Sequence, residues 1–551
     1  MQLYKNFCEE TLDENGNLID FELCVPENYN FGYDVVDEMA KKAPNDTAVV
    51  WTNPDGEEKI FTFEDISKLS NKAANVFKNH GIGKGDKVLV ILKRNYEYWY
   101  VCPALHKLGA VIIPATHLLN QSDINYRVQT ANVKAAVCTP DETTAEDLLA
   151  VASQPNPLEK VFVARRYLFG TIDLTSEIEE ASDELERVET NVNDPMLIYF
   201  TSGTTGYPKA VEHNHTYSLA HIITSKYWQC VKEGGLHFTV AETGWAKASW
   251  GKMYGQWLCG CAVMVYDFDH FSPGKLLKIM EKYKVTSFCA PPTVYNYFIK
   301  RGMDKYNLDS LEHLSTAGEA LNSEVFDKVY EQTGIKLMEG FGQTETTLIV
   351  ANLKGAVTKP GSMGKPTPLY DVHIINDHGE EVPDGGTGEL VVYPREGKKQ
   401  YGIFMTYYGN DELYKNVWRG GVYHTGDTAY KDKDGYFWYV GRADDLIKTR
   451  GFRVGPFEVE NVIMQYPNVL ECAVIGVPDK DRGQAIKAIV KMADGHEHDH
   501  DLENKIKTFC NKRMASYKWI QHLEIVDEFS KTISGKIKRT TLRKNDAEKR
   551  G

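Results

Sequence analysis

The segment from Thr201 to Lys209 carries the residue types that bind phosphate. It reads Thr-Ser-Gly-Thr-Thr-Gly-Tyr-Pro-Lys and follows an apolar, strand-like run from Met196 to Phe200. Glycines let the backbone come close to an anion, hydroxyls offer neutral donors, and the lysine adds a positive charge. The segment is not a Walker loop, because no glycine–lysine pair follows the first glycine at the required spacing. The composition predicts a phosphate-binding loop, and a flexible polar turn is the alternative.

Carboxylates, amides and glycines gather in further short strings downstream of this loop. Together with the loop, these strings resemble the signature of the adenylate-forming superfamily, which comprises acyl-CoA synthetases, peptide-synthetase adenylation domains and luciferases. They occur in the family's order, so a chance likeness at one loop does not explain them. They are Gly318-Glu319-Ala320 and Glu339-Gly340-Phe341-Gly342-Gln343-Thr344-Glu345-Thr346 for the adenine pocket, Tyr423-His424-Thr425-Gly426-Asp427 for the ribose, Gly441-Arg442-Ala443-Asp444-Asp445 for the hinge, and Ser534-Gly535-Lys536 for a terminal catalytic lysine.

Three other strings are similar to the medium-chain acyl-CoA synthetases within this superfamily. They begin at Gly244 (Gly-Trp-Ala-Lys), Lys359 (Lys-Pro-Gly-Ser-Met-Gly-Lys-Pro) and Gly455 (Gly-Pro-Phe-Glu-Val-Glu). This likeness favours ligation to coenzyme A over a stand-alone adenylation domain. It implies an AMP-forming acyl-CoA synthetase that uses ATP, Mg²⁺ and coenzyme A. The expected substrate is a medium-chain or similar apolar carboxylic acid.

The implied reaction has two halves, and the resemblance gives three residues a catalytic part in them. Lys536 places an ammonium between the substrate carboxylate and the α-phosphate, and losing such a donor typically costs ~10² to 10³ in rate. Glu345 is expected to bind Mg²⁺, a hard cation that prefers oxygen ligands, and Thr204 adds a hydroxyl. Arg453 is expected to move toward phosphate. Ser530 stands where the family usually has proline, which is expected to loosen the approach of the lysine without removing its charge.

The resemblance also assigns the contacts that hold the nucleotide. Asp427 offers two acceptors to the ribose hydroxyls, and Arg442 donates to the same sugar. Taken singly, each of these residues is equally well explained as a solvated charge. The remaining contacts are Thr201, Ser202, Gly203, Thr204, Thr205, Gly206 and Lys209 at the phosphates, and Gly318, Glu319, Ala320, Glu339, Gly340, Phe341, Gly342, Gln343 and Thr344 around adenine.

The second half-reaction is expected to use a different surface. In the family, the small C-terminal domain rotates about a residue matching Asp444 and presents the segment around Gly451 to the pantetheine tunnel. A glycine suits a thin thioester arm that passes close to the backbone. Arg450 replaces the serine that is common beside that glycine, so the lining of the tunnel differs here. The expected coenzyme A contacts are Gly451, Phe452, Arg482 and Trp519.

Trp245 is the best single pointer to the acyl pocket, with Thr344 and Gly318 near the carboxylate end. A tryptophan is more often part of a core than of a ligand-binding wall, and only the surrounding string favours the pocket here. The depth of the pocket depends on side chains that the sequence does not place. A short, branched or aromatic acid is therefore the first alternative substrate.

An α/β body is predicted to position these side chains. Val88 to Lys93 and Ala110 to Pro114 are strand-like runs that flank a helix-like segment from Tyr96 to Leu108. The same order recurs between Ala262 and Ala290, where Ser272-Pro273 has the residue types of a helix cap and first turn. Strand–helix–strand units build parallel sheets.

Beyond Tyr370 the pattern changes to short strands, at 372–376 and 389–393, separated by turns, which predicts a β-rich subdomain. We therefore expect an α/β fold: a large N-terminal domain of stacked α/β sheets plus the β-rich subdomain, and a small, mobile α+β C-terminal domain. The expected boundaries are 1–443 for AMP and acyl binding and 444–551 for the mobile domain with the catalytic lysine.

The chain has 551 residues and a formal charge of −14, so no general affinity for nucleic acid or for anionic membranes is expected. It has no apolar run long enough to suggest a spanning helix, and its acidic start lacks the features of a signal peptide. The cysteines form no CxxC pair and are expected to be reduced thiols. These features favour a cytoplasmic location, and they leave the oligomeric state open, a homodimer included.

Other features carry less weight. The alternating His496, His498 and His500 are better explained by an exposed loop than by a metal site. His213 and His215 are expected to be satisfied structural histidines, and the basic C-terminal tail is expected to be a solvated helix. An alternative from another class is a nucleotide-binding sensor without turnover. The intact set of Lys209, Glu345, Asp427, Arg453 and Lys536 argues against it.

Overall fold

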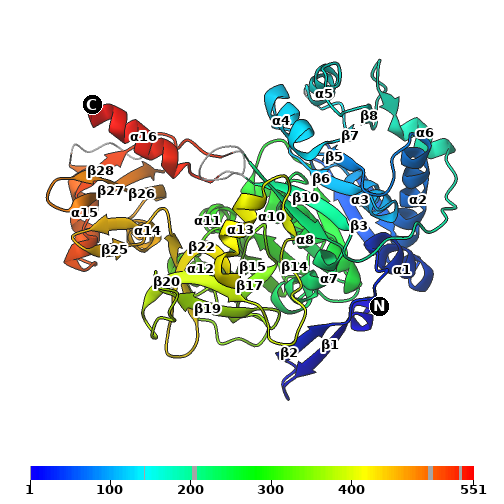
Figure 1. Cartoon of the computed structure of the whole chain (residues 1–551). Helices are drawn as coiled ribbons and strands as arrows, with labels where there is room; N and C mark the ends of the chain where they lie inside the picture. Colours follow the sequence, from blue (N-terminus) through cyan, green and yellow to red (C-terminus); the bar gives the residue numbers. More distant parts are fainter. Residues whose placement is uncertain (1, 142, 202–207, 494–500, 533–535, 551) are drawn as a thin grey trace.

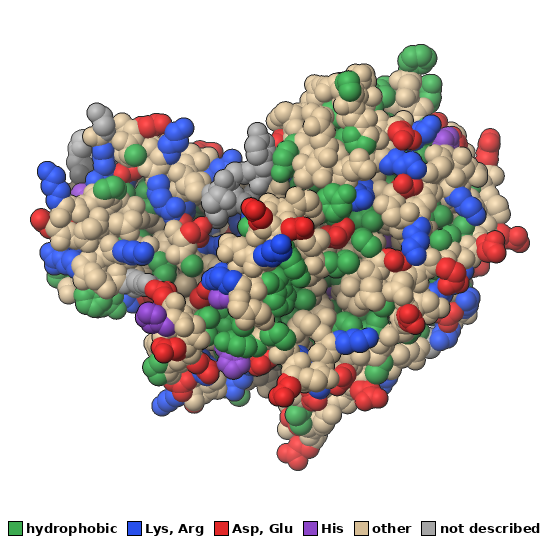
Figure 2. Space-filling view, viewed as in Figure 1, with side chains coloured by type: hydrophobic (Ala, Val, Ile, Leu, Met, Phe, Trp, Pro, Cys, Tyr) green, Lys and Arg blue, Asp and Glu red, His purple; other side chains and the backbone are tan. Residues whose placement is uncertain are grey.

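The structure is a computed structural model that describes residues 2–141, 143–201, 208–493, 501–532 and 536–550. Figure 1 shows a large α/β body and a smaller C-terminal unit at the left, which contains the helix α16 (Arg539–Arg550). The expected α/β class, with a large N-terminal and a smaller C-terminal domain, is confirmed. On the face shown in Figure 2, Lys and Arg side chains are frequent over the C-terminal unit.

The first sheet of the body is parallel at its centre. Its eight strands, in spatial order, are β21 (Thr406–Tyr407), β11 (Lys209–Asn214), β10 (Pro195–Thr201), β6 (Val111–Pro114), β5 (Lys87–Ile91), β7 (Ala135–Cys138), β8 (Lys160–Val163) and β9 (Ile172–Asp173). Helix α3 (Tyr98–Lys107) connects β5 to β6, as the sequence predicts. The side chains of these central strands are almost entirely buried, because helices cover both faces of a parallel sheet.

The second sheet carries the loops that matter for the site. Its strands, in spatial order, are β18 (Lys365–Pro366), β17 (Leu348–Ala351), β16 (Leu337–Gly342), β15 (His313–Thr316), β14 (Ser287–Ala290), β12 (Leu236–Thr239), β13 (Ala262–Tyr266), β3 (Thr47–Thr52) and β4 (Glu58–Thr62). From β13 to β16 neighbouring strands are parallel. Their carboxyl ends lead into the predicted adenine loops, where open α/β sheets generally bind ligands.

Two antiparallel sheets follow in the chain. The β-rich subdomain has β19 (Asp371–Ile375), β20 (Thr387–Tyr393), β22 (Tyr423–Lys431) and β23 (Phe437–Arg442), and the C-terminal sheet has β24 (Ile447–Thr449), β25 (Phe452–Val454), β26 (Val469–Asp479), β27 (Gly483–Met492) and β28 (His522–Ile525). A separate hairpin near the N-terminus pairs β1 (Cys8–Leu12) with β2 (Leu18–Leu23). The predicted strands at 372–376 and 389–393 are confirmed.

Helices pack on these sheets. The remaining ones are α1 (Glu38–Lys42), α2 (Phe63–Asn79), α4 (Gln121–Ala131), α5 (Thr144–Ala152), α6 (Leu174–Glu180), α7 (Thr216–Ile222), α8 (Ala246–Lys252), α9 (Tyr254–Leu258), α10 (Pro273–Lys282), α11 (Pro292–Arg301), α12 (Ser323–Thr333), α13 (Asp411–Val417), α14 (Pro456–Ile463) and α15 (Leu502–Asn511). Ser272 precedes α10 as predicted, but its hydroxyl makes no capping bond to the helix.

The C-terminal domain has an apolar core of its own, built from β24, β26, β27, α14 and α15 and including Ile447, Val474 and Ile506. Helix α16 is mostly exposed, as expected for the basic tail, yet its Asp546 is buried. Lys487 Nζ of β27 lies 2.8 Å from Asp546 Oδ1, so an ion pair attaches the helix to the sheet.

All ten cysteines are free, as the sequence predicts. In the part of the chain that the structure describes, no helix combines the length and the apolar composition needed to cross a membrane.

Gly244, which follows β12 of the second sheet, lies against the backbone that follows β6 of the first sheet. A Cβ at this position would overlap the backbone of Ala115 and Thr116, which follow β6. Gly244 is therefore fixed by backbone contact, and it directly precedes Trp245.

We expect Gly244→Ala to destabilise the protein by about 1–3 kcal/mol, because neither backbone can move without disturbing its sheet. Thermal unfolding measures the effect. Gly83→Ala is the matched control, since a Cβ there meets no atom within 4 Å. Equal melting temperatures for the two variants would contradict the close approach.

Candidate active site

A buried carboxylate, Asp427, lies at the centre of the candidate site. It is 5% exposed and belongs to β22, directly opposite Arg442 of β23. Gln343 Nε2 donates to Asp427 Oδ2 over 2.6 Å, the Tyr439 hydroxyl donates to Oδ1 over 3.1 Å, and Arg442 Nη1 lies 3.4 Å from Oδ2. Burial raises the pKa of Asp427. The positive charge of Arg442 and, to a smaller extent, that of Lys536 oppose this rise. Residues from three of the predicted strings thus meet here.

Gln343 joins this carboxylate to the end of β16. Its side chain also donates to the Thr425 carbonyl over 2.9 Å and accepts from the Tyr423 hydroxyl over 2.7 Å. Phe341, two residues earlier, packs its ring 6.1 Å from that of Tyr439. The predicted adenine and ribose strings are therefore held together by direct side-chain contacts.

Glu345 lies close to the predicted phosphate loop. The Tyr407 hydroxyl donates to Glu345 Oε1 over 2.8 Å, and Lys209 Nζ lies 5.4 Å from the centre of the Tyr407 ring. Tyr407 therefore contacts both Glu345 and Lys209, the two residues that the sequence predicts at the metal ion and at the phosphates. Thr201 and Lys209 are opposite each other at the ends of β10 and β11.

Mg²⁺ suits the donor set around Glu345. One carboxylate oxygen accepts from Tyr407, and a Mg²⁺ ion typically uses one or two carboxylates together with substrate phosphates and water. Among the described residues, no group of three or more His, Cys, Asp or Glu side chains could hold a metal by itself. A protein site completed by nucleotide phosphates fits both observations.

Two further glutamates lie nearby: Glu339 belongs to β16, and Glu319 lies on the loop after β15. Glu339 is 4% exposed, its Oε1 accepts from the backbone N–H of Leu321 over 3.2 Å, and burial raises its pKa to about 8. Glu319 accepts from the Thr293 hydroxyl over 2.7 Å. Gly318 has φ +102°, and no atom lies within 4 Å of where its Cβ would stand, so a ligand could approach the backbone at this point.

The start of α8 lies next to the Gly318 loop. Trp245 precedes the helix, and Lys247 Nζ donates to the Ala317 carbonyl over 3.1 Å. Trp245 is partly exposed rather than embedded in the core. Thr344 is held by a different contact: His213 Nε2 donates to the Thr344 carbonyl over 2.7 Å.

His213 is a satisfied structural histidine, as predicted, and burial lowers its pKa to about 4. His215 differs from the prediction. It is fully buried, yet neither ring nitrogen has a hydrogen-bond partner within the described residues. The sequence does not distinguish the two, because the partner of His213 comes from a segment far along the chain.

Two described segments, 530–532 and 536–538, pair antiparallel just before α16, and we call this pair of segments the Lys536 hairpin. Thr532 N donates to the Lys536 carbonyl over 2.7 Å, and Lys536 N donates to Thr532 Oγ1 over 3.1 Å. Lys531 and Ile537 form an antiparallel bridge. The charge of Lys536 is the weakest of the influences that oppose the burial-raised pKa of Asp427.

The predicted hinge lies beside this cluster. Arg442 Nε is 3.6 Å from Asp444 Oδ1, so the arginine that contacts Asp427 also contacts the predicted hinge residue. Asp445, the next residue, pairs with Arg543 of α16.

The predicted coenzyme A residues lie on the C-terminal domain, apart from the Asp427 cluster. Gly451 has φ +81° and Arg450 has φ +49°, so the chain turns sharply here. Arg450 N donates to the Arg482 carbonyl over 2.8 Å. Phe452 is half exposed and stacks on Tyr517 at 4.5 Å, and Trp519 is 45% exposed. These side chains form an accessible aromatic and basic surface.

Several predictions fall outside the described residues. They are the phosphate-loop residues Ser202, Gly203, Thr204, Thr205 and Gly206, the hinge-proximal side chain of Arg453, Ser534 and Gly535, and the histidines at 496, 498 and 500.

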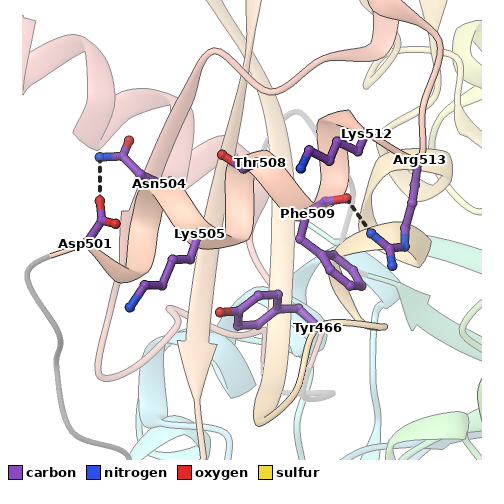
Figure 3. Close-up of a pocket in the computed structure, with 8 residues that line it drawn as sticks. All are labelled: Tyr466, Asp501, Asn504, Lys505, Thr508, Phe509, Lys512 and Arg513. Carbon is purple, nitrogen blue, oxygen red and sulfur yellow. Dashed lines mark hydrogen bonds between the residues drawn. The ribbon is translucent and has the colours of Figure 1, made fainter.

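A pocket of about 420 Å³ lies elsewhere, on the outer face of the C-terminal domain (Figure 3). Its lining comes from Tyr466 and from α15 and the residues next to it, and Arg513 donates to the Phe509 carbonyl over 3.0 Å. No predicted site residue lines it. The pocket is therefore not the candidate active site.

Sequence reasoning missed Tyr407 and Tyr439. Both donate their hydroxyls to carboxylates of the site, and neither belongs to a string that resembles the family. For Tyr439 the sequence offers one signal. It stands two residues after Phe437 in a strand, so the two side chains lie on the same face of the sheet.

Residues 36–408 match the family model described as AMP-binding enzyme, and residues 458–536 match the model described as AMP-binding enzyme C-terminal domain. The human acyl-coenzyme A synthetase ACSM3, mitochondrial, is 39% identical over 537 residues, which cover 96% of this chain and 91% of that protein. The human acyl-coenzyme A synthetase ACSM4, mitochondrial, is 38% identical over 536 residues, covering 96% and 92%.

Two solved structures are similar over nearly the whole chain. The anthranilate CoA ligase AuaEII, in complex with anthranoyl-AMP, is 27% identical with a TM-score of 0.87, covering 95% of this chain and 98% of that one. The Brucella canis acyl-CoA synthetase is 28% identical with a TM-score of 0.72, covering 95% of each chain. Since both human proteins are mitochondrial by name, the cytoplasmic location expected from the sequence is wrong.

The raised pKa of Glu339 predicts a pH-dependent difference in stability. A carboxyl whose pKa is raised to about 8 by folding binds its proton more tightly in the folded state. Its favourable contribution is present below the ordinary glutamate pKa and is lost as the pH rises through the folded pKa.

We therefore expect Glu339→Gln, which keeps the acceptor for Leu321, to gain stability relative to the unmodified protein between about pH 5.5 and about pH 8. The difference between the two melting temperatures measures this, because other titrating groups cancel. A difference that stays constant with pH would contradict a buried neutral Glu339.

Proposed function

Because the chain belongs to the family of AMP-binding enzymes, we propose that it activates a medium-chain or similar apolar carboxylic acid with the residues gathered around Asp427. The chain is an AMP-forming acyl-CoA synthetase, an acid–thiol ligase that uses ATP, Mg²⁺ and coenzyme A. The observation that best supports the proposed site is that Gln343 and Arg442, from two separate strings, both contact the buried carboxylate of Asp427.

In the first half-reaction, the substrate carboxylate attacks the α-phosphorus of ATP and pyrophosphate leaves. Asp427 accepts from the ribose hydroxyls, and Arg442 and Gln343 hold that carboxylate in place. Lys536 donates to the oxygens that gain charge at the α-phosphate, and Arg453 approaches the phosphates. Such fixed donors act through positioning and electrostatic stabilisation.

Glu345, oriented by Tyr407, would hold Mg²⁺ together with the phosphates, and Thr204 would add a hydroxyl. When bound, the ion neutralises phosphate charge. Lys209 lies over the ring of Tyr407 and adds a positive charge for the leaving pyrophosphate.

In the second half-reaction, the thiolate of coenzyme A attacks the acyl carbonyl of the adenylate and AMP leaves. We place the boundary of the mobile domain between residues 443 and 444. Rotation of this domain about Asp444 would withdraw Lys536 from the adenylate and bring Gly451 toward the acyl group. Phe452, Arg482 and Trp519 then receive the nucleotide end of coenzyme A. Their exposure on the small domain supports this role.

The acyl group is proposed to lie between the Gly318 loop, Thr344 and Trp245. Lys247 supports this placement because it fastens α8 to the backbone just before Gly318. An aromatic acid is the second candidate, since a ligase that is similar over most of this chain acts on anthranilate by name. A sensor without turnover is set aside, because the relatives are synthetases.

Lys536→Ala is expected to lower acyl-adenylate formation by about 10²- to 10³-fold, because a preorganised donor at the α-phosphate is lost. Thioester formation from supplied acyl-adenylate should remain largely intact. Pyrophosphate release and thioester formation are measured separately. Equal loss in both half-reactions would refute the proposed role.

The function as a whole is tested by pyrophosphate release across straight-chain, branched and aromatic acids, with and without coenzyme A. We expect release that depends on a medium-chain acid, and thioester only when coenzyme A is present. Trp245→Ala should shift the preferred chain length, and an unchanged acid profile would remove Trp245 from the pocket. If only aromatic acids gave pyrophosphate release, the proposed medium-chain substrate would be wrong and an aromatic acid would take its place.

A further inference from the structure

Arg539, the first residue of α16, is held by a buried carboxylate. Its Nη2 donates to Glu460 Oε1 over 2.6 Å, and its Nη1 lies 3.9 Å from Asp445 Oδ2. The same Glu460 oxygen accepts from the backbone N–H of Val474 in β26 over 2.8 Å. Arg539 is thus fixed to the sheet of the C-terminal domain through a carboxylate that cannot easily move.

The hairpin that carries Lys536 depends on such fixed points. Lys538 N donates to the Ser530 carbonyl over 2.9 Å, which closes the hairpin immediately before Arg539. An isolated two-stranded hairpin is at best marginally stable, so its orientation must come from contacts with the domain. Ile537 and Phe529 pack against the apolar cluster that contains Ile475.

Ion pairs of Arg539 and of Lys531 both attach this segment to the C-terminal domain. Lys531 Nζ lies 2.7 Å from Glu471 Oε2, and these side chains are 36% and 15% exposed. The Arg539 and Glu460 side chains are 28% and 10% exposed, so their pair is slightly less accessible to water, and exposed ion pairs contribute little. The hydrogen bond from Arg539 to a carboxylate that also accepts from Val474 is of the stronger, charge-assisted kind.

Arg539 also lies near the proposed hinge. Its Nη1 is 3.9 Å from Asp445 Oδ2, and the preceding residue, Asp444, has its Oδ1 3.6 Å from Arg442 Nε. The arginine therefore contacts the residue after the hinge as well as the carboxylate that fixes it to the sheet.

We propose that Arg539 is a positioning residue, which holds the Lys536 hairpin against the C-terminal domain so that the ammonium reaches the α-phosphate. This inference rests on the proposed role of Lys536. Arg539 itself touches no reacting atom. Its loss should therefore misplace the lysine for adenylate formation but leave the thiolation surface, which lies on other elements, in its place.

Arg539→Gln tests the proposal. We expect pyrophosphate release without coenzyme A to fall by about 10- to 100-fold, because a displacement of about 1 Å at a reacting group can cost 10² in rate. The KM values for ATP and acid, and thioester formation from supplied acyl-adenylate, should stay within about threefold, and Arg539→Lys should recover part of the rate. Lys544→Gln is the matched control, since Lys544 lies on the same helix with 77% side-chain exposure.

Glu460→Gln is a second variant that keeps the acceptor for Val474 and weakens only the attachment of Arg539. The same split between the half-reactions is expected. Equal losses in both half-reactions that follow the melting temperature, or an unchanged rate of adenylate formation, would overturn the proposal. If Lys536→Ala also left adenylate formation intact, the proposed role of Lys536 would fail instead, so the two failures are distinguishable.

Discussion

The charge of Asp427 is the constraint on which the site depends. A carboxylate removed from water is costly unless donors satisfy both oxygens, and here an amide, a phenol and a guanidinium do so. Gln343 comes from the end of β16, whereas Tyr439 and Arg442 come from β23. Satisfying one carboxylate therefore fixes the β-rich subdomain against the loop of the second sheet. A ligand whose hydroxyls donate to the remaining acceptor sites of Asp427 meets a carboxylate that its protein partners already hold in place.

Arg442 connects this cluster to the proposed hinge. It contacts both Asp427 and Asp444, while the adjacent Asp445 is held by Arg543 of the C-terminal helix. Asp444 and Asp445 thus pair with arginines from different parts of the chain, one in β23 and one in α16. In the domain rotation that we propose, the contact of Arg442 with Asp444 changes, whereas the ion pair of Asp445 with Arg543 moves with the small domain. The proposed rotation therefore acts on the Asp427 cluster through the side chain of Arg442.

The parallel core and the order of the site strings could be predicted from the sequence, and the contacts that complete the site could not. Strands such as β5 and β13 read as apolar runs because both faces are covered. Tyr407, in contrast, matters only because β21 pairs beside β11, which brings it between Glu345 and Lys209. Ser272 is a residue type that caps helices, yet it makes no capping hydrogen bond. His215 has no hydrogen-bond partner among the described residues, whereas His213 donates to Thr344. Composition specifies what a residue can do, and long-range packing decides whether it does so.

The order of functional groups along the chain has a consequence for protein synthesis. Asp427 and its partners are complete long before the ribosome reaches Lys536, which lies close to the C-terminus. A chain that ended before Ser530 would still contain Asp427, Gln343, Tyr439 and Arg442 but would lack Lys536. The buried carboxylate and its donors are therefore encoded independently of the last segment, which adds only the C-terminal ammonium.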